Sequence, residues 1–214
     1  MEYEISGINQ SQVKPAIGLT FATAMRSFVR QDPDVIMVGE VRDSETAHIS
    51  IHAALTGHLV LTTLHTETAA AAVPRLIDLG VEPFLLRSTL RGVIAQRLVR
   101  LLCDRCKRQR RLTAADLSAD PRYVALGFKA EEVLHEPVGC DRCGGSGYRG
   151  RAGVFEIIEM NDDVRKLVDT RYDSSTIEQA ALRAGMTTML DDAVAKCRAG
   201  MTSPAEALRV VALR

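Results

Sequence analysis

A strand–helix–strand pattern in residues 34–64 most constrains how this chain can fold. Residues 35–39 are a short apolar run rich in Val and Ile, the pattern of a strand covered on both faces. Ser44 is a candidate helix N-cap, and Gly57 fits the left-handed position that follows a helix. A second apolar segment, residues 58–64, comes next. Two strands joined by one helix predict a βαβ unit, and therefore a parallel sheet.

Composition and the following segments fit an α/β protein of ordinary type. The chain has 214 residues, 46% hydrophobic and 25% charged, which suits one or two globular domains. Residues 67–79 are predicted to form the next helix, ended by Gly80 and Pro83. No apolar run approaches the ~20 residues of a membrane-spanning helix. The N-terminal residues MEYEISGINQ do not resemble a signal peptide, so we expect a cytoplasmic protein.

A carboxylate and an imidazole follow the two predicted strands. Glu40 comes directly after the first strand and His65 directly after the second. Parallel sheets bind ligands at the carboxyl ends of their strands, so the pair indicates a site. Glu40 suits a general base for phosphoryl transfer, and His65 suits a hydrogen-bond donor to phosphate. The alternative is an ion pair between Glu40 and Arg42 or Arg30.

A phosphate-binding loop is missing from this sequence. No GxxxxGK[ST] motif occurs, and no lysine follows a glycine. A nucleotide site needs backbone donors and a lysine to hold the phosphates. We therefore expect the isolated chain to bind ATP weakly and to hydrolyse little of it.

Four of the five cysteines form two CxxC pairs. Cys103 and Cys106 form the first pair, and Cys140 and Cys143 form the second. Four thiolates are enough for a closed tetrahedral zinc site, so we predict a structural Zn²⁺. A redox dithiol and an unmetallated pair are the weaker alternatives. Helical turns are predicted in the intervening segment, at residues 113–117 and 130–134.

The first cysteine pair lies within a basic run, residues 97–111. A zinc ribbon with such a run invites a nucleic-acid-binding interpretation. The run contains no aromatic residue for base stacking, so we expect no specific nucleic-acid partner. Net charge is zero, with 27 basic and 27 acidic residues, and gives no support either.

Two isolated features favour plain structural roles. His48 and His52 are four apart on the predicted helix, but no third metal ligand accompanies them. Cys197 falls on a predicted amphipathic helix and fits a buried thiol.

The C-terminal region reads as helical. A helix is predicted from Asn161 to about Val168, and another over residues 189–198. Capping boxes are predicted at residues 175–178 and 203–206, which would start two more helices. The expected result is a small helical bundle without a catalytic constellation.

Several long motifs together resemble one family, the ATPases of type II secretion and type IV pilus assembly. The matching stretches are RQDPDVIMVGEVRD, TGHLVLTTLHT, AQRLVRLLC and GYRGRAGVFEI. The resemblance implies that Glu40 is the catalytic glutamate of an atypical Walker B segment. It also implies that His58 and His65 belong to a histidine box near the γ-phosphate, and that Glu2 ends an acidic box. It supports the zinc assignment, because many members carry a tetracysteine motif.

The resemblance further implies an architecture and a role. Residues 1–100 would be part of a RecA-like ATPase core, 101–150 the four-cysteine zinc module, and 151–214 the helical subdomain. The whole would be the C-terminal part of a hexameric motor, with the P-loop upstream of Met1. ATP and Mg²⁺ would be used at the cytoplasmic face of the inner membrane, where the motor contacts platform proteins. Type II secretion is favoured, with pilus assembly or a non-catalytic zinc-containing adaptor as alternatives.

Overall fold

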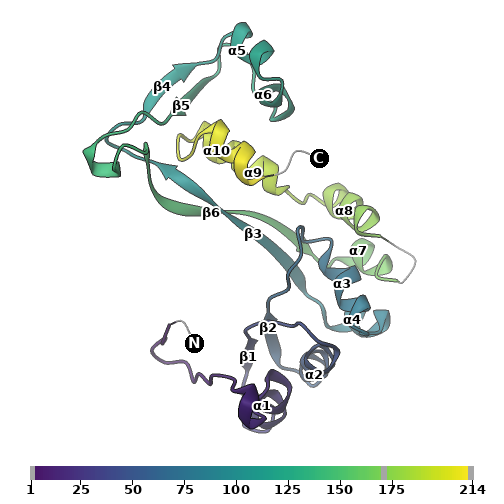
Figure 1. Cartoon of the computed structure of the whole chain (residues 1–214). Coiled ribbons are helices and arrows are strands. Elements are labelled where there is room, and N and C mark those ends of the chain that lie inside the picture. Colours follow the sequence, from purple (N-terminus) through teal and green to yellow (C-terminus); the bar gives the residue numbers. More distant parts are fainter. Residues whose placement is uncertain (1–2, 170–172, 212–214) are drawn as a thin grey trace. The chain divides into compact units, whose positions relative to one another are not determined.

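The computed structural model describes residues 3–169 and 173–211 (Figure 1). By spatial contacts the chain divides into two compact units. Unit 1 consists of residues 1–91 and 160–178, and unit 2 consists of residues 92–159 and 179–214. The functional boundaries at residues 100 and 150 stay a prediction.

The core of unit 1 is a two-stranded parallel sheet. Strands β1 (Val35–Val38) and β2 (Leu59–Thr62) pair in parallel and are joined by helix α2 (Ser44–Leu55). The α/β fold class with a parallel sheet is therefore confirmed. The N-cap of α2 is Asp43 rather than Ser44, because the Asp43 carboxylate accepts the Thr46 backbone N–H at 2.8 Å.

The prediction that the first strand is covered on both faces was wrong. Burial alternates along β1: Ile36 and Val38 are buried, whereas Val35 and Met37 are 53% and 70% exposed. Strand β2 is likewise exposed at Leu59 and Leu61. Among the described residues, the covered face of this sheet is the one that carries Ile36 and Val38.

Short helices complete unit 1. The helix predicted over residues 67–79 begins only at Ala72, because Pro74 fits the first turn of a helix but not its interior. Pro83, expected to end that helix, instead begins the next one. Asn161 caps a helix as predicted. The remaining elements are η1 (Pro15–Ile17), α1 (Phe21–Phe28), α3 (Ala72–Asp78), α4 (Pro83–Thr89) and α7 (Asp162–Lys166).

Unit 2 is organised on a long antiparallel ribbon. Strands β3 (Gly92–Leu102) and β6 (Tyr148–Glu159) pair along nearly their whole length, with a register shift between Arg100 and Leu102 (Figure 1). Helix α9 (Met189–Arg198) packs against β6, and helix α10 (Pro204–Val210) packs against β3 and α9. The buried core of this unit contains Val99, Leu112, Leu126, Phe128, Leu134, Val154, Met189, Ala193, Val194, Cys197, Ala207 and Val211.

The outer edge of β3 is hydrogen-bonded by the segment that enters α10. Leu102 N–H donates to the Met201 carbonyl at 2.8 Å, and the Thr202 hydroxyl donates to the Arg100 carbonyl at 2.8 Å. Arg100 N–H donates to a Glu206 carboxylate oxygen at 2.9 Å. Polar groups that an edge strand would leave open are satisfied here by residues 201–206.

A second hairpin lies between the two cysteine pairs. Strands β4 (Arg108–Arg111) and β5 (Val133–Glu136) pair antiparallel, and helices α5 (Ala114–Ala119) and α6 (Arg122–Ala125) lie between them in the chain. The helical turn predicted at residues 113–117 is present. The one predicted at residues 130–134 was wrong, because the end of that segment joins β5.

The last helices follow the sequence prediction closely. Helix α9 has the predicted bounds, and the Ser203 hydroxyl accepts the Glu206 N–H as the N-cap of α10. The capping box predicted at residues 175–178 was wrong, because Ser175 already lies inside helix α8 (Ser174–Arg183). The Asp173 carboxylate accepts the Thr176 N–H instead. Helix α8 spans the division between the two units at residue 178.

Candidate functional site

The ends of β1 and β2 are tied together just beyond the sheet. Val41 N–H donates to the Thr63 carbonyl at 3.0 Å, and the Thr63 hydroxyl donates to the Gly39 carbonyl at 2.7 Å. These bonds continue the parallel pairing past both strands. They fix the backbone on each side of Glu40 and bring His65 to the same edge of the sheet.

Glu40 contacts Arg42 and His65 through one oxygen. Its Oε2 lies 2.7 Å from Nε of Arg42 and 3.3 Å from Nε2 of His65. The Glu40 side chain is 26% exposed, whereas the Arg42 and His65 side chains are 68% and 76% exposed. The sequence left a choice between site chemistry and a Glu40–Arg42 ion pair. The structure contains the ion pair, and it also brings His65 to the same oxygen of Glu40.

A cleft of about 470 Å³ opens beside Glu40. This volume lies in the range typical of small-molecule pockets. Its acidic lining residues other than Glu40 are already engaged: Asp43 caps α2, and Glu45 pairs with Arg26 at 2.6 Å. The lining residues are Val13, Pro15, Thr20, Phe21, Ala22, Glu40, Arg42, Asp43, Glu45 and Thr46.

His58 and His65 do not line this cleft. His58 immediately precedes β2, at the opposite end of the strand from His65, and its Nδ1 lies 2.9 Å from the Ala53 carbonyl oxygen. Glu2 lies outside the described residues. The nucleotide-binding roles of Glu2, His58 and His65 therefore stay predictions.

The two histidines of helix α2 have ordinary surroundings. Nδ1 of His48 lies 2.7 Å from the Ser44 carbonyl oxygen, one turn earlier in the helix, and His52 is exposed. Neither belongs to a potential metal-binding group among the described residues.

In unit 2 the four cysteines of the CxxC pairs come together. Cys103, Cys106, Cys140 and Cys143 place their sulfur atoms within 4.8 Å of one another. Three of the Sγ–Sγ separations are 3.9, 3.8 and 3.8 Å. A tetrahedral site with Zn–S bonds of ~2.3 Å requires about 3.8 Å between sulfurs. The cluster could therefore hold a metal ion.

Backbone N–H groups surround this cluster and favour thiolates. Cys143 Sγ accepts hydrogen bonds from the backbone N–H groups of Cys140 and Gly147, both at 3.2 Å. Burial alone would raise the pKa of Cys143, but these hydrogen bonds lower it to about 6. Burial raises the pKa of Cys106 to about 11, although the Gly139 N–H opposes that rise. The pKa of Cys143 thus lies below that of Cys106.

Cys197 is separate from the cluster and fully buried. Burial raises the pKa of its thiol to about 12, so it stays protonated at neutral pH.

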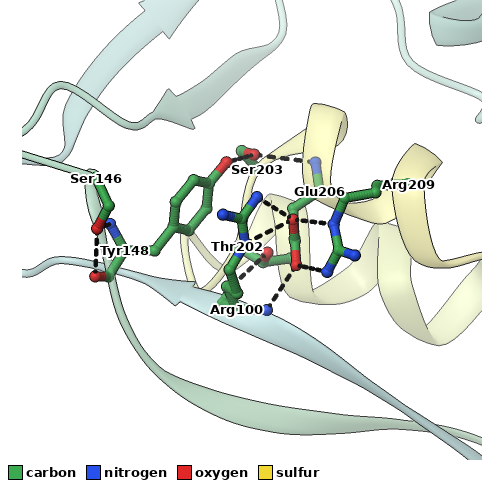
Figure 2. A network of polar contacts seen from close by, with 7 residues as sticks. All are labelled: Arg100, Ser146, Tyr148, Thr202, Ser203, Glu206 and Arg209. Atoms are coloured by element: carbon green, nitrogen blue, oxygen red, sulfur yellow. Dashed lines mark hydrogen bonds and ion pairs between the residues drawn. The ribbon is translucent and has the colours of Figure 1, made fainter.

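A buried carboxylate in unit 2 was not singled out from the sequence. Glu206 is 1% exposed and accepts hydrogen bonds from both Arg100 and Arg209 (Figure 2). The Arg100 guanidinium also lies over the Tyr148 ring, 4.2 Å from its centroid, and the Tyr148 hydroxyl is 2.6 Å from that of Ser203. Glu206 was interpreted as half of a capping box, but its side chain turns to the arginines.

The basic run of residues 97–111 is partly neutralised within unit 2. Arg110 pairs with Asp116 and Glu136, and Arg111 pairs with Glu131. Lys107 donates to the Gly200 carbonyl at 2.9 Å, at the end of helix α9. Together with Arg100, these side chains have internal partners. Much of the run is therefore structural.

Across the residues that the structure describes, no helix has the length and apolar character needed to cross a membrane.

The fold and sites define an α/β protein with a polar rim at the carboxyl ends of parallel strands and a separate four-cysteine module. The family model described as "Type II/IV secretion system protein" matches residues 1–209. The chain belongs to this family.

Two curated relatives illustrate the similarity. The type IV pilus assembly ATPase PilB of Thermus thermophilus is 47% identical over 213 residues, covering 97% of this chain and 23% of the relative. The type II secretion system protein E of Pectobacterium carotovorum is 46% identical over 211 residues, covering 98% of this chain and 41% of the relative. The chain thus spans less than half the length of these relatives.

Two solved structures, one of an ATPase and one of a pilus retraction motor, have a similar fold. The Legionella pneumophila ATPase DotB gives a TM-score of 0.59 at 25% identity, covering 92% of this chain and 44% of that one. The pilus retraction motor PilT with bound ADP gives 0.59 at 26% identity, covering 89% and 43%. The predicted resemblance to secretion and pilus ATPases is confirmed.

Proposed function

We propose that this chain is part of an ATP-hydrolysing motor for type II protein secretion, with Glu40 as its catalytic base. The observation that carries the proposal is the convergence of Glu40 and His65 at one edge of the parallel sheet, beside a cleft, in a chain of this family. Relatives named as secretion and pilus ATPases support the activity.

In the proposed reaction Glu40 accepts a proton from the water that attacks the γ-phosphorus of ATP. The phosphorus–oxygen bond to ADP breaks, and ADP and inorganic phosphate leave. Phosphoryl transfer depends mainly on positioning and charge stabilisation, so a base held by a fixed backbone suits it. His65 beside Glu40 would contact a terminal phosphate, and Mg²⁺ would neutralise its charge. Since the sequence has no GxxxxGK[ST] motif, we place the phosphate cradle outside these residues.

The four-cysteine cluster is proposed to hold a structural Zn²⁺. Four thiolates favour zinc over hard cations such as Mg²⁺, and four ligands leave no open coordination position. Cys103, Cys106, Cys140 and Cys143 would hold the ion, which would supply no chemistry to the reaction. Its role would be to join the two ends of the β4–β5 insertion.

Assembly and location follow the same proposal. We expect a hexameric ring that works at the cytoplasmic face of the inner membrane and contacts platform proteins there. We expect no specific nucleic-acid partner, because much of the basic run already has internal partners. Pilus assembly is the second candidate, since PilB is as similar to this chain as protein E is.

The experiment is a hydrolysis assay of a full-length motor that carries this segment. Residues 1–209 can replace the matching stretch of Thermus thermophilus PilB, and Glu40→Gln is compared with the unchanged chimera. We expect turnover to fall at least 100-fold while ATP still binds, because the amide cannot accept the proton. Glu67→Gln is the matched control, an exposed carboxylate that follows β2 as Glu40 follows β1. Normal turnover in Glu40→Gln would disprove the assignment of the base.

A further inference from the structure

The contact between Glu40 and Arg42 poses a problem for a catalytic base. Nε of Arg42 forms an ion pair with the same oxygen of Glu40 that Nε2 of His65 approaches. The guanidinium therefore occupies an oxygen that would otherwise be open to take a proton from water. If Glu40 activates water, this ion pair has to change during the reaction.

The backbone around Arg42 is fixed, while its side chain is free to move. Val41, between Glu40 and Arg42, is 3% exposed, and its N–H is bonded to the Thr63 carbonyl. Both Glu40 and Arg42 line the cleft. The Arg42 side chain is 68% exposed and has no other acceptor among the described residues. Because most of the side chain faces solvent, the guanidinium can leave Glu40 with little loss of packing.

Arg42 is also the sole cation among the described residues that line the cleft. Arg26, the neighbouring candidate, is paired with Glu45 at 2.6 Å. An anion entering the cleft would consequently meet the Arg42 guanidinium. A terminal phosphate carries more charge than a carboxylate and accepts bidentate hydrogen bonds from arginine, so it competes well for this group.

We propose that Arg42 is a positioning residue that exchanges Glu40 for the terminal phosphate of a nucleoside triphosphate. With no triphosphate present, Arg42 holds Glu40 and hinders its action as a base. When the triphosphate binds, Arg42 pairs with its last phosphate and frees Glu40 for water. The exchange couples recognition of the third phosphate to activation of the base, and it rests on the proposed function.

The test is a binding cycle in the same chimeric motor, with Mg²⁺ present. Affinities for ADP and for a non-hydrolysable ATP analogue are measured in the parent, Glu40→Gln, Arg42→Gln and the double variant. We expect Arg42→Gln to lower the affinity for the analogue about tenfold and to change the affinity for ADP less than twofold. Glu40→Gln alone should increase the affinity for the analogue severalfold, because Arg42 is no longer paired with Glu40. The double variant, in which Arg42 is also replaced, should show no such increase.

Two controls make the result specific. Arg30→Gln removes an exposed arginine that does not line the cleft, and it should alter neither affinity. Arg42→Lys should recover part of the preference for the analogue, since it keeps a charge without the fork. The proposal is overturned if Arg42→Gln lowers the affinities for ADP and for the analogue equally, or changes neither affinity. It is also overturned if Glu40→Gln tightens the analogue equally with and without Arg42. These binding results are independent of whether Glu40→Gln abolishes turnover.

Discussion

Arg100 and Glu206 are 106 residues apart in the sequence and joined by three hydrogen bonds, from the backbone N–H, Nε and Nη2 of Arg100. Arg209 adds two more, at 2.8 and 2.6 Å. One buried carboxylate thereby connects strand β3 to helix α10. A carboxylate so deeply buried is stable only while its partners remain.

Replacing this carboxylate should destabilise unit 2. Glu206→Gln keeps the shape but removes the charge, leaving two arginines without their acceptor. We expect the free energy of unfolding to fall by about 2 kcal/mol, less than for a fully buried pair because both arginines are partly exposed. Chemical denaturation measures the change. Glu159→Gln, at an exposed position of β6, should change it by less than about 0.5 kcal/mol. Equal effects of the two substitutions would contradict this role.

The same carboxylate should make stability depend on acid. Burial alone would raise the pKa of Glu206, but hydrogen bonds from Arg209 and Arg100 lower it from 4.5 to about 2. A lowered pKa contributes stability that is present above pH 4.5 and is lost as the pH falls toward 2. The stability difference between the parent and Glu206→Gln should therefore shrink over that interval. A difference that stays constant from pH 5 to pH 2.5 would argue against the linkage.

The cysteine cluster should bind about one zinc ion per chain. Elemental analysis of the purified protein measures this, and Cys143→Ser should lower the zinc content severalfold because it removes one thiolate. Cys197→Ala is the control, since that thiol is buried elsewhere in unit 2. Zinc retained at parent levels by Cys143→Ser, or lost equally by Cys197→Ala, would contradict the assignment.

Two glycines beside the cysteines should respond differently to alanine. Both have positive φ, 60° at Gly144 and 76° at Gly147. A Cβ at Gly144 meets nothing within 4 Å, whereas one at Gly147 would lie 2.4 Å from the Pro137 Cβ. Gly144→Ala should cost about 1 kcal/mol and Gly147→Ala about 3 kcal/mol or more.

Thermal unfolding and zinc content of the two glycine variants provide the measurement. Because Gly147 N–H also donates to Cys143 Sγ, Gly147→Ala should lower zinc retention as well. If Gly144→Ala proves the more damaging, the described packing around Pro137 is wrong.

Local patterns carried most of the successful sequence prediction. The βαβ unit was predictable because its signals lie within a few residues of one another: an apolar run, a cap and Gly57. The convergence of the four cysteines was predictable from chemistry, since two CxxC pairs gain stability by sharing a metal.

Features that depend on distant partners were not predictable in this way. Residues 130–134 carry no periodicity that separates helix from strand, and pairing with β4 decides the outcome. The role of Glu206 was hidden because a capping box explains it locally, while its partner Arg100 lies on another element. The contact of Arg42 with Glu40 was anticipated as an alternative to a catalytic role, yet Glu40 contacts both Arg42 and His65.

The bonds from residues 201–206 to the edge of β3 have a consequence for how the chain behaves during synthesis. Until these residues emerge and dock, Arg100 and Leu102 present unsatisfied backbone groups at an open strand edge, which other chains can pair with. The ribbon of β3 and β6 is therefore vulnerable to misassociation until the last helix arrives. The C-terminal segment protects the nascent protein as well as completing its core.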